Sequence, residues 1–273
     1  MTDSSSPCRV YANENLDGPV AIEAAGATLV VHTSASPEGD GGNEDAAALL
    51  FAADAGAVLA VADGVGGHPS GAHAAVLAID AMHASIRDHA AWPTLRSAVV
   101  AGFDRANDAV LALGVGAATT LAVAKIEGDR LRPFHVGDSV VALIGPRGDR
   151  KFLSVPHSPV GYAVEAGVID ERDALMHAER HFVTNVVGSD TMHVDVGPSL
   201  SIDDGDTILL ATDGLLDNLY LHEIFELLRE GPLLDVAEAL RRECLARMAV
   251  TSTGPSKPDD VTFVLYRRNP PAR

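Results

Sequence analysis

Apolar residues recur at helical spacing in two adjacent stretches of the first half of the chain. Between residues 70 and 91 they fall on one face of a predicted helix, at positions Ala72, Ala75, Val76, Ile79, Met82, His83 and Ile86. A second helix is expected to begin after Thr94, because threonine is a good N-cap residue. Its apolar stripe comprises Leu95, Val99, Phe103, Ala106, Val110 and Leu113. Two further helices are predicted near 221–229 and 233–248.

The remaining apolar segments are short runs bounded by turn residues, which is the pattern of strands. Gly128-Asp129 lies between two of these runs and is a tight hairpin signal. The predicted strands cover residues 27–33, 47–53, 57–62, 119–127, 130–136, 139–145, 151–155, 207–212 and 261–267.

Residues 160–184 interrupt the strand pattern with short helical stretches, and we expect them to be an insertion. The order of strands, two helices, strands, insertion, strand, helices and strand is not a βαβ repeat. It predicts an α+β fold in which two packed antiparallel sheets are flanked by helix pairs. One domain would span 27–267, after an N-terminal segment at 1–26 that could be frayed and before a loop-like tail at 268–273.

The composition narrows the class of protein. With 47% hydrophobic and 21% charged residues, the 273-residue chain is globular rather than disordered. A formal net charge of −18 lacks the basic footprint that nucleic acids and anionic membranes require, so neither is an expected partner, and we expect a monomer. Cys8 and Cys244 are too few for a disulfide scaffold and indicate a reducing compartment. Without a signal peptide or a spanning apolar run, a cytoplasmic protein is expected.

Carboxylates stand at the ends of several predicted strands. Asp63 follows the run 58–62 and precedes a glycine-rich turn, and Asp213 follows 208–212 in the same way. Asp259-Asp260 opens the last strand. If these groups meet at one rim of a sheet, two like charges about 4 Å apart repel by roughly 4 kcal/mol at an effective dielectric near 20. Divalent ions that prefer oxygen ligands, Mg²⁺ or Mn²⁺, would relieve that repulsion.

Seven short motifs then carry a resemblance. In chain order they are Asn43-Glu44-Asp45, Asp63-Gly64-Val65-Gly66-Gly67-His68, Thr119-Thr120-Leu121, Val136-Gly137-Asp138-Ser139, His157-Ser158-Pro159-Val160, Thr212-Asp213-Gly214-Leu215-Leu216-Asp217 and Asp259-Asp260-Val261-Thr262. Their order and spacing resemble those of the metal-dependent protein phosphatases of the protein phosphatase 2C type, over nearly the whole chain. The resemblance implies that family's four-layer α-β-β-α sandwich, with residues 160–184 as a flap beside the active-site cleft.

The resemblance also implies a role for each acidic residue. Asp63 would bridge two Mn²⁺ or Mg²⁺ ions, and the Gly64 carbonyl would ligate one of them. Asp213 and Asp259 would complete the other. The remaining positions are Glu44 and Asp45, acting mostly through metal-bound water, and Asp138 and Asp217, framing a third and weaker metal site.

The implied activity is hydrolysis of phosphoserine and phosphothreonine in proteins by a metal-activated water at the binuclear centre. The natural partners would be a Ser/Thr kinase and its phosphorylated targets. Two alternatives stay open at this point. One is a degenerate phosphatase that binds phosphoproteins without turnover, and the other is a metal-dependent hydrolase of small phosphate esters.

Several positions depart from the family pattern. Asp40 and Val140 stand where the family commonly has arginines, and Asp260 stands where it has asparagine, so either Asp259 or Asp260 could be the ligand. The phosphate would then need another cation, such as Arg172 or Arg180 from the flap.

Three histidines each carry two interpretations. His68 is a candidate general acid or a histidine that stabilises the turn. His177 and His181, four residues apart in the insertion, could hold a second metal but are expected to be solvated.

Overall fold

The computed structural model describes residues 8–269, apart from 40–41, 53–55, 66–68, 230 and 250–253. Its strands are β1 (Arg9–Ala12), β2 (Val20–Ala24), β3 (Ala27–Ser34), β4 (Asp45–Phe51), β5 (Ala57–Val65), β6 (Ala118–Thr119), β7 (Leu121–Glu127), β8 (Arg130–Val136), β9 (Val140–Ile144), β10 (Arg150–Leu153), β11 (Asp195–Val196), β12 (Leu200–Ser201), β13 (Thr207–Ala211) and β14 (Val261–Arg268). They form two antiparallel sheets. The first has the order β1-β4-β5-β7-β8-β11, with β6 beside β5 and β12 beside β8, and the second has the order β10-β9-β13-β14-β3-β2.

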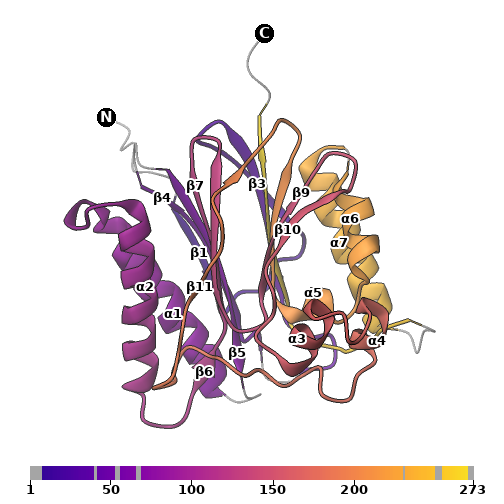
Figure 1. Cartoon of the computed structure of the whole chain (residues 1–273), viewed down its shortest axis with the longest axis horizontal. Helices are drawn as coiled ribbons and strands as arrows, with labels where there is room; N and C mark the ends of the chain where they lie inside the picture. Colours follow the sequence, from indigo (N-terminus) through magenta and orange to yellow (C-terminus); the bar gives the residue numbers. More distant parts are fainter. Residues whose placement is uncertain are drawn as a thin grey trace.

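Helices cover the outer face of each sheet (Figure 1). The helices of the described residues are α1 (Pro69–Arg87), α2 (Leu95–Leu111), α3 (Pro159–Glu165), α4 (Glu171–Leu175), α5 (Asp213–Leu216), α6 (Leu221–Leu228) and α7 (Leu233–Met248), with a 3-10 turn at His89–Ala91. The pair α1 and α2 lies on the first sheet and the pair α6 and α7 on the second. The predicted α+β class and α-β-β-α layering are confirmed.

The central strands show why the chain carries continuous apolar runs instead of alternating ones. On β4, Ala46 and Ala48 pack beneath the first helix pair, while Ala47 and Leu49 pack between the two sheets. Neighbouring β5 divides its residues between the same two clusters in the same way. A strand that is buried on both faces has no position left for a polar residue.

Most predicted elements lie within a few residues of their expected limits. The Thr94 side chain caps α2 by accepting a hydrogen bond from the Ser97 N–H, as expected. The prediction that the strand ends at residue 62 is wrong, because β5 continues through Asp63 to Val65. Its last two residues are held by pairing with β6.

The prediction of a frayed N-terminal segment is wrong for the part that the structure describes. Residues 9–12 form β1, paired with β4, and residues 20–24 form β2, paired with β3. Both are edge strands, and β2 is exposed at Val20, Ala21 and Glu23, so neither has the buried apolar run that marks the central strands.

Helices α3 and α4 lie in the predicted insertion, which packs over α5 (Figure 1). Among the described residues, none of the helices has both the length and the apolar character needed to cross a lipid bilayer.

Candidate functional site

The predicted acidic residues come together where the two sheets end side by side. Asp45 and Asp63 are direct partners in the antiparallel pair of β4 and β5. Asp213 begins α5 immediately after β13, and Asp259 lies just before β14. Because β13 and β14 are antiparallel neighbours, the last two carboxylates share one end of the second sheet. The site therefore draws ligand-type oxygens from both sheets.

Hydrogen bonds fix the backbone of Asp63. Its N–H donates to Thr120 Oγ1 (3.0 Å), and its carbonyl accepts from the Thr120 N–H (2.9 Å) and from Thr119 Oγ1 (2.7 Å). Thr120 Oγ1 also contacts Ser139 Oγ at 2.7 Å. The Thr119-Thr120 motif thus positions Asp63 without itself reaching the carboxylate.

A second set of hydrogen bonds joins the two sheets at the site. Thr212 Oγ1 donates to Asp45 Oδ2 at 2.9 Å. The carboxylate of Asp260 accepts from the backbone N–H groups of Ser36 (2.8 Å) and Glu44 (2.5 Å). Because both Asp260 oxygens are occupied by backbone donors, this residue ties the loop before β4 to the start of β14. This leaves Asp259 as the candidate ligand, while the Asp260 charge, after burial, still raises the pKa of Asp45.

Asp138 lies in the turn between β8 and β9, which a buried histidine holds in place. Gly137 has a φ of 101°, a backbone conformation that favours glycine. Its N–H donates to His157 Nδ1 (3.1 Å), and the His157 N–H donates to the Gly137 carbonyl (3.0 Å). His157, from one of the seven motifs, therefore positions the turn that carries Asp138.

At Gly64 the strand β5 and the helix α1 approach closely. A Cβ atom at Gly64 would clash with the backbone of Gly71, and one at Gly71 would lie 2.8 Å from Glu44 Oε2. Glycine at both positions lets the start of α1 lie against the end of β5, with Glu44 above the contact.

Lys257 is the site residue that sequence reasoning missed. Its Nζ lies 2.7 Å from Asp213 Oδ2, 3.0 Å from Asp217 Oδ2 and 2.8 Å from Asp259 Oδ2. Its position two residues before Asp259 in a loop is the only sequence signal, and a lysine in a loop is ordinarily solvated. A second cation reaches the same group from the flap, since Arg180 Nε lies 3.7 Å from Asp217 Oδ2.

Burial and mutual repulsion raise the pKa values of the clustered carboxyl groups. Burial raises the pKa of Asp63 well above its usual range, and the charges of Asp213 and Asp45 raise it further. Burial also raises the pKa of Asp45 well above its usual range, and the Asp260 charge adds to this effect. Burial and the Asp213 charge raise the pKa of Asp138 to about 7 and that of Asp217 to about 6. Burial by itself lowers the pKa of Lys257, but its three carboxylate neighbours raise it overall. These directions are those of a cluster whose negative charge exceeds the cations within it.

Other predicted residues lie outside the cluster or outside the described residues. His68 and Asp40 fall in the ranges that the structure does not describe. Arg172 lies with its guanidinium carbon 5.9 Å from the centroid of the Tyr220 ring. His177 accepts a hydrogen bond from the Glu179 N–H, whereas His181 contacts the ring of Phe182. The two histidines are exposed and do not form a metal site together.

Within the described residues, the one trio whose ligand atoms all lie within 4.8 Å of one another is His135, His157 and Asp195. Its hydrogen bonds disfavour a metal. His157 Nδ1 accepts from Gly137 and from Asn185 Nδ2 (2.9 Å), so Nε2 carries the proton and faces Asp195 Oδ2 at 3.2 Å. Since His135 Nε2 contacts the Val155 carbonyl at 2.8 Å, it too is a donor. The trio therefore supports the Gly137 turn.

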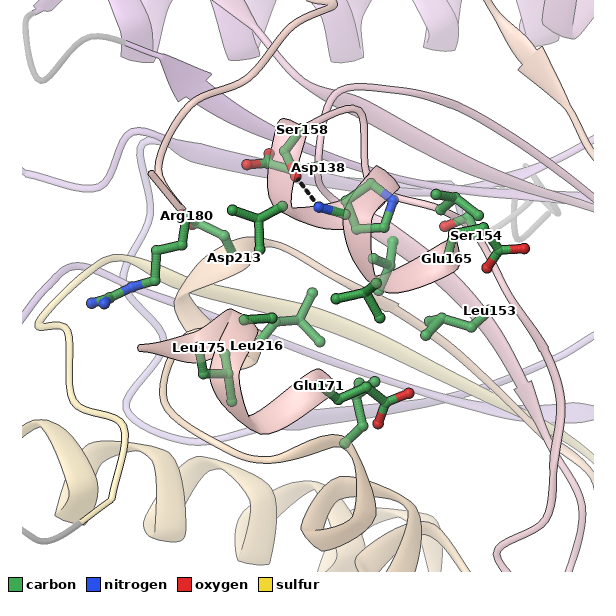
Figure 2. Close-up of a pocket in the computed structure, with 18 of the residues that line it drawn as sticks. Asp138, Leu153, Ser154, Ser158, Glu165, Glu171, Leu175, Arg180, Asp213 and Leu216 are labelled. Atoms are coloured by element: carbon green, nitrogen blue, oxygen red, sulfur yellow. Dashed lines mark hydrogen bonds between the residues drawn. The ribbon is translucent and has the colours of Figure 1, made fainter. Parts of the chain in front are cut away.

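A cavity of about 330 Å³ opens beside the acidic cluster, between the flap helices and α5. Figure 2 shows Asp138, Asp213 and Arg180 at one end of it and Leu153 at the other. Apolar side chains form most of its wall, among them Val160, Val164, Leu175, Leu216, Leu219 and Leu221. The cavity can therefore receive an apolar group next to the acidic cluster.

Comparison with known proteins shows to which family this chain belongs. The family model described as protein phosphatase 2C matches residues 39–245. The chain belongs to the protein phosphatase 2C family. The serine/threonine protein phosphatase PstP of Mycobacterium tuberculosis is 32% identical to it over 219 residues, which cover 76% of this chain and 40% of PstP. The protein phosphatase PhpP of Streptococcus pneumoniae is 28% identical over 221 residues, which cover 78% of this chain and 86% of PhpP. The chain thus spans two fifths of the first relative and most of the second.

Solved structures of PstP have the same protein phosphatase 2C fold. The M. tuberculosis enzyme aligns with a TM-score of 0.73 at 26% identity, covering 88% of this chain and 98% of that one. The PstP catalytic domain in complex with two manganese ions aligns with a TM-score of 0.67 at 26% identity, covering 88% and 97%.

The acidic cluster of this protein phosphatase 2C chain suits divalent cations. Its donors are carboxylates, the hard oxygen ligands that Mn²⁺ and Mg²⁺ prefer. Burial first, and then the charges of neighbouring carboxylates, raise the pKa values of Asp63 and Asp138, and a bound cation would favour their ionised forms. The residues present therefore fit the ions that the family implies.

Proposed function

We propose that this chain is a manganese- or magnesium-dependent phosphatase of phosphoserine and phosphothreonine in proteins. The observation that carries the proposal is the group of carboxylates gathered from the ends of both sheets, in a chain of the protein phosphatase 2C family. The negative charge of these carboxylates requires cations, and the two sheets hold the carboxylates at fixed positions.

Two ions would be held by Asp63, the Gly64 carbonyl, Asp213 and Asp259, with Glu44 and Asp45 beside them. Asp138 and Asp217 would frame a third. Bound there, the ions would lower the pKa of a water molecule and neutralise the phosphoryl oxygens during its attack. The protein supplies positioning: Thr119 and Thr120 hold the Asp63 backbone, and His157 holds the Asp138 turn.

Arg180 is the proposed phosphate-holding residue. It is the flap arginine beside the acidic cluster, 3.7 Å from Asp217, and about a quarter of its side chain is exposed. A guanidinium group can donate two parallel hydrogen bonds to phosphate oxygens. The alternative candidate, Arg172, lies against Tyr220 instead.

The cavity under the flap supports a protein substrate over a small phosphate ester. It adjoins the acidic cluster, but most of its wall is apolar, with valine and leucine side chains in the lining (Figure 2). A peptide bound by its phosphate could place a neighbouring apolar side chain there, which a small ester lacks. The proposed partners are phosphorylated targets of a Ser/Thr kinase. We further propose that the protein is a monomer that acts in the cytoplasm, in signalling.

The test compares turnover of a phosphothreonine peptide and of p-nitrophenyl phosphate in Mn²⁺, in Mg²⁺ and in EDTA. We expect metal-dependent turnover of the peptide that Asp213→Asn abolishes and that Asp203→Asn, an exposed aspartate paired with Lys151, retains. Peptide turnover that continues unchanged in EDTA would contradict the proposal. Turnover of the small ester alone would indicate the small-ester hydrolase, and tight peptide binding without turnover would indicate the degenerate binding module.

A further inference from the structure

Lys257 places a positive charge inside the acidic cluster. Its ammonium nitrogen lies within 3.0 Å of one oxygen on each of Asp213, Asp217 and Asp259. About a quarter of the lysine side chain is exposed, and the Asp217 side chain is mostly buried. An ammonium group has three N–H donors, so these contacts can use all of them.

The backbone of Lys257 is fixed, so the side chain does not reach the cluster by chance. The Lys257 N–H donates to Asn218 Oδ1, and Asn218 Nδ2 donates to the Lys257 carbonyl, both at 2.8 Å. Asn218 is fully buried and also donates to the Gly214 carbonyl at 2.8 Å. It joins the lysine loop to α5, the helix that carries Asp213.

Two of the three lysine partners have another assignment under the proposed function. Asp213 and Asp259 are the carboxylates expected to complete one divalent ion, and Lys257 contacts an oxygen of each. An ammonium and a divalent cation drawn to the same carboxylates repel each other in a partly buried site. The two cations therefore favour different states of the cluster.

We propose that Lys257 is a built-in counter-ion of the acidic cluster, which competes with the divalent ion assigned to Asp213 and Asp259. The inference rests on the proposed metal-dependent function and adds a way of regulating it. Without that ion, Lys257 keeps the carboxylates together and stabilises the fold. When the ion binds, the ammonium leaves Asp213 and Asp259. The lysine thereby weakens metal binding. Activity then requires a higher metal concentration than it would if the carboxylates had no lysine beside them.

The test is Lys257→Met, which keeps a long unbranched side chain and removes the charge. Mn²⁺ binding is measured by calorimetry, and the melting temperature is measured in EDTA. The variant should bind Mn²⁺ on the order of tenfold more tightly, within the usual range for coupled sites. Its melting temperature in EDTA should fall below that of the wild type, because the carboxylates lose their counter-ion. A purely structural role would weaken both properties together.

Two further variants complete the experiment. Lys257→Arg keeps the charge and should bind Mn²⁺ as the wild type does. Lys151→Met removes a lysine that is also paired with two carboxylates, Asp203 and Asp206 (2.8 Å each), but outside the cluster, and should leave Mn²⁺ affinity unchanged.

The inference is overturned if the wild type binds Mn²⁺ and Lys257→Met binds it equally or more weakly. It is equally overturned if Lys257→Arg binds as tightly as Lys257→Met. If neither the wild type nor Lys257→Met binds Mn²⁺, the proposed metal-dependent function fails as well, which separates that outcome from the first two.

Discussion

Asp138 tests how strongly burial and neighbouring charges disfavour an ionised carboxylate in the cluster. Its pKa is raised from 3.8 to about 7, first by burial and then by the Asp213 charge. One pKa unit corresponds to about 1.4 kcal/mol, so ionising Asp138 in the folded, metal-free protein costs about 4 kcal/mol relative to the unfolded chain. Asn has the shape of the protonated acid and carries no charge. Asp138→Asn should therefore stabilise the metal-free protein by up to about 4 kcal/mol wherever the wild-type carboxyl group is ionised.

The sign of the pH dependence follows from that raised pKa. The folded state binds the Asp138 proton more tightly than the unfolded state, so its contribution is unfavourable at high pH. Stability is lost as the pH rises from about 4 to about 7, the unfolded and folded pKa values. The gain from Asp138→Asn should be near its maximum at pH 8 and only about 1 kcal/mol at pH 4.5. His32, whose pKa burial lowers to about 4, contributes a slope of opposite sign, but it does so in both proteins and cancels in the difference.

The assay is urea unfolding of both proteins in EDTA at pH 4.5 and pH 8, followed by circular dichroism. A stability difference that is the same at both pH values would refute the reasoning, and so would a less stable variant at pH 8. Repeating the measurement at pH 8 in saturating Mn²⁺ should remove or reverse the gain, because bound cations favour the ionised carboxylate.

Three other outcomes test the same site. Asp63→Asn should leave the fold intact but weaken the binding of both Mn²⁺ ions, and two undiminished sites in a calorimetric titration would contradict the bridging role predicted for Asp63. Mn²⁺ at a hundred times its Kd should stabilise the wild type by about 2.7 kcal/mol over EDTA, seen as a higher melting temperature, and equal melting temperatures would exclude a specific metal site. Arg180→Gln should raise KM for a phosphothreonine peptide more than it lowers kcat, whereas Arg172→Gln should change neither, and an unchanged KM in Arg180→Gln would remove it as the phosphate-holding group.

The sequence predicts the central architecture well because the strongest signals come from buried elements. Runs such as 57–62 are apolar at every position since both faces of the strand are covered, and helices α1 and α2 show clear periodicity. Edge strands β1 and β2 were missed because pairing on one side stabilises them without a continuous apolar pattern.

The candidate site could be predicted in its acidic residues but not in how their charge is balanced. Asp63 and Asp213 stand beside strand ends, and that pattern is visible in the chain. The sequence leaves Asp259 and Asp260 as alternative ligands, and it cannot show that both Asp260 oxygens accept hydrogen bonds from backbone N–H groups, which favours Asp259 as the proposed ligand. The place of Lys257 depends on a buried asparagine 39 residues away in the chain, which no local pattern encodes.

The hydrogen bond from Thr212 to Asp45 joins the two sheets. Ions held by carboxylates from both sheets would add further links between them. Metal affinity then depends on how well the two sheets pack against each other. By linkage, a change that loosens the packing between the sheets weakens metal binding even when it is remote from the carboxylates. Leu59, which packs between the sheets, and Leu50, which packs under the helices, are both fully buried but belong to opposite sides of the first sheet. Truncating Leu59 should therefore lower metal affinity more than truncating Leu50. The residues packed between the sheets then contribute to metal affinity even though they lie away from the carboxylates.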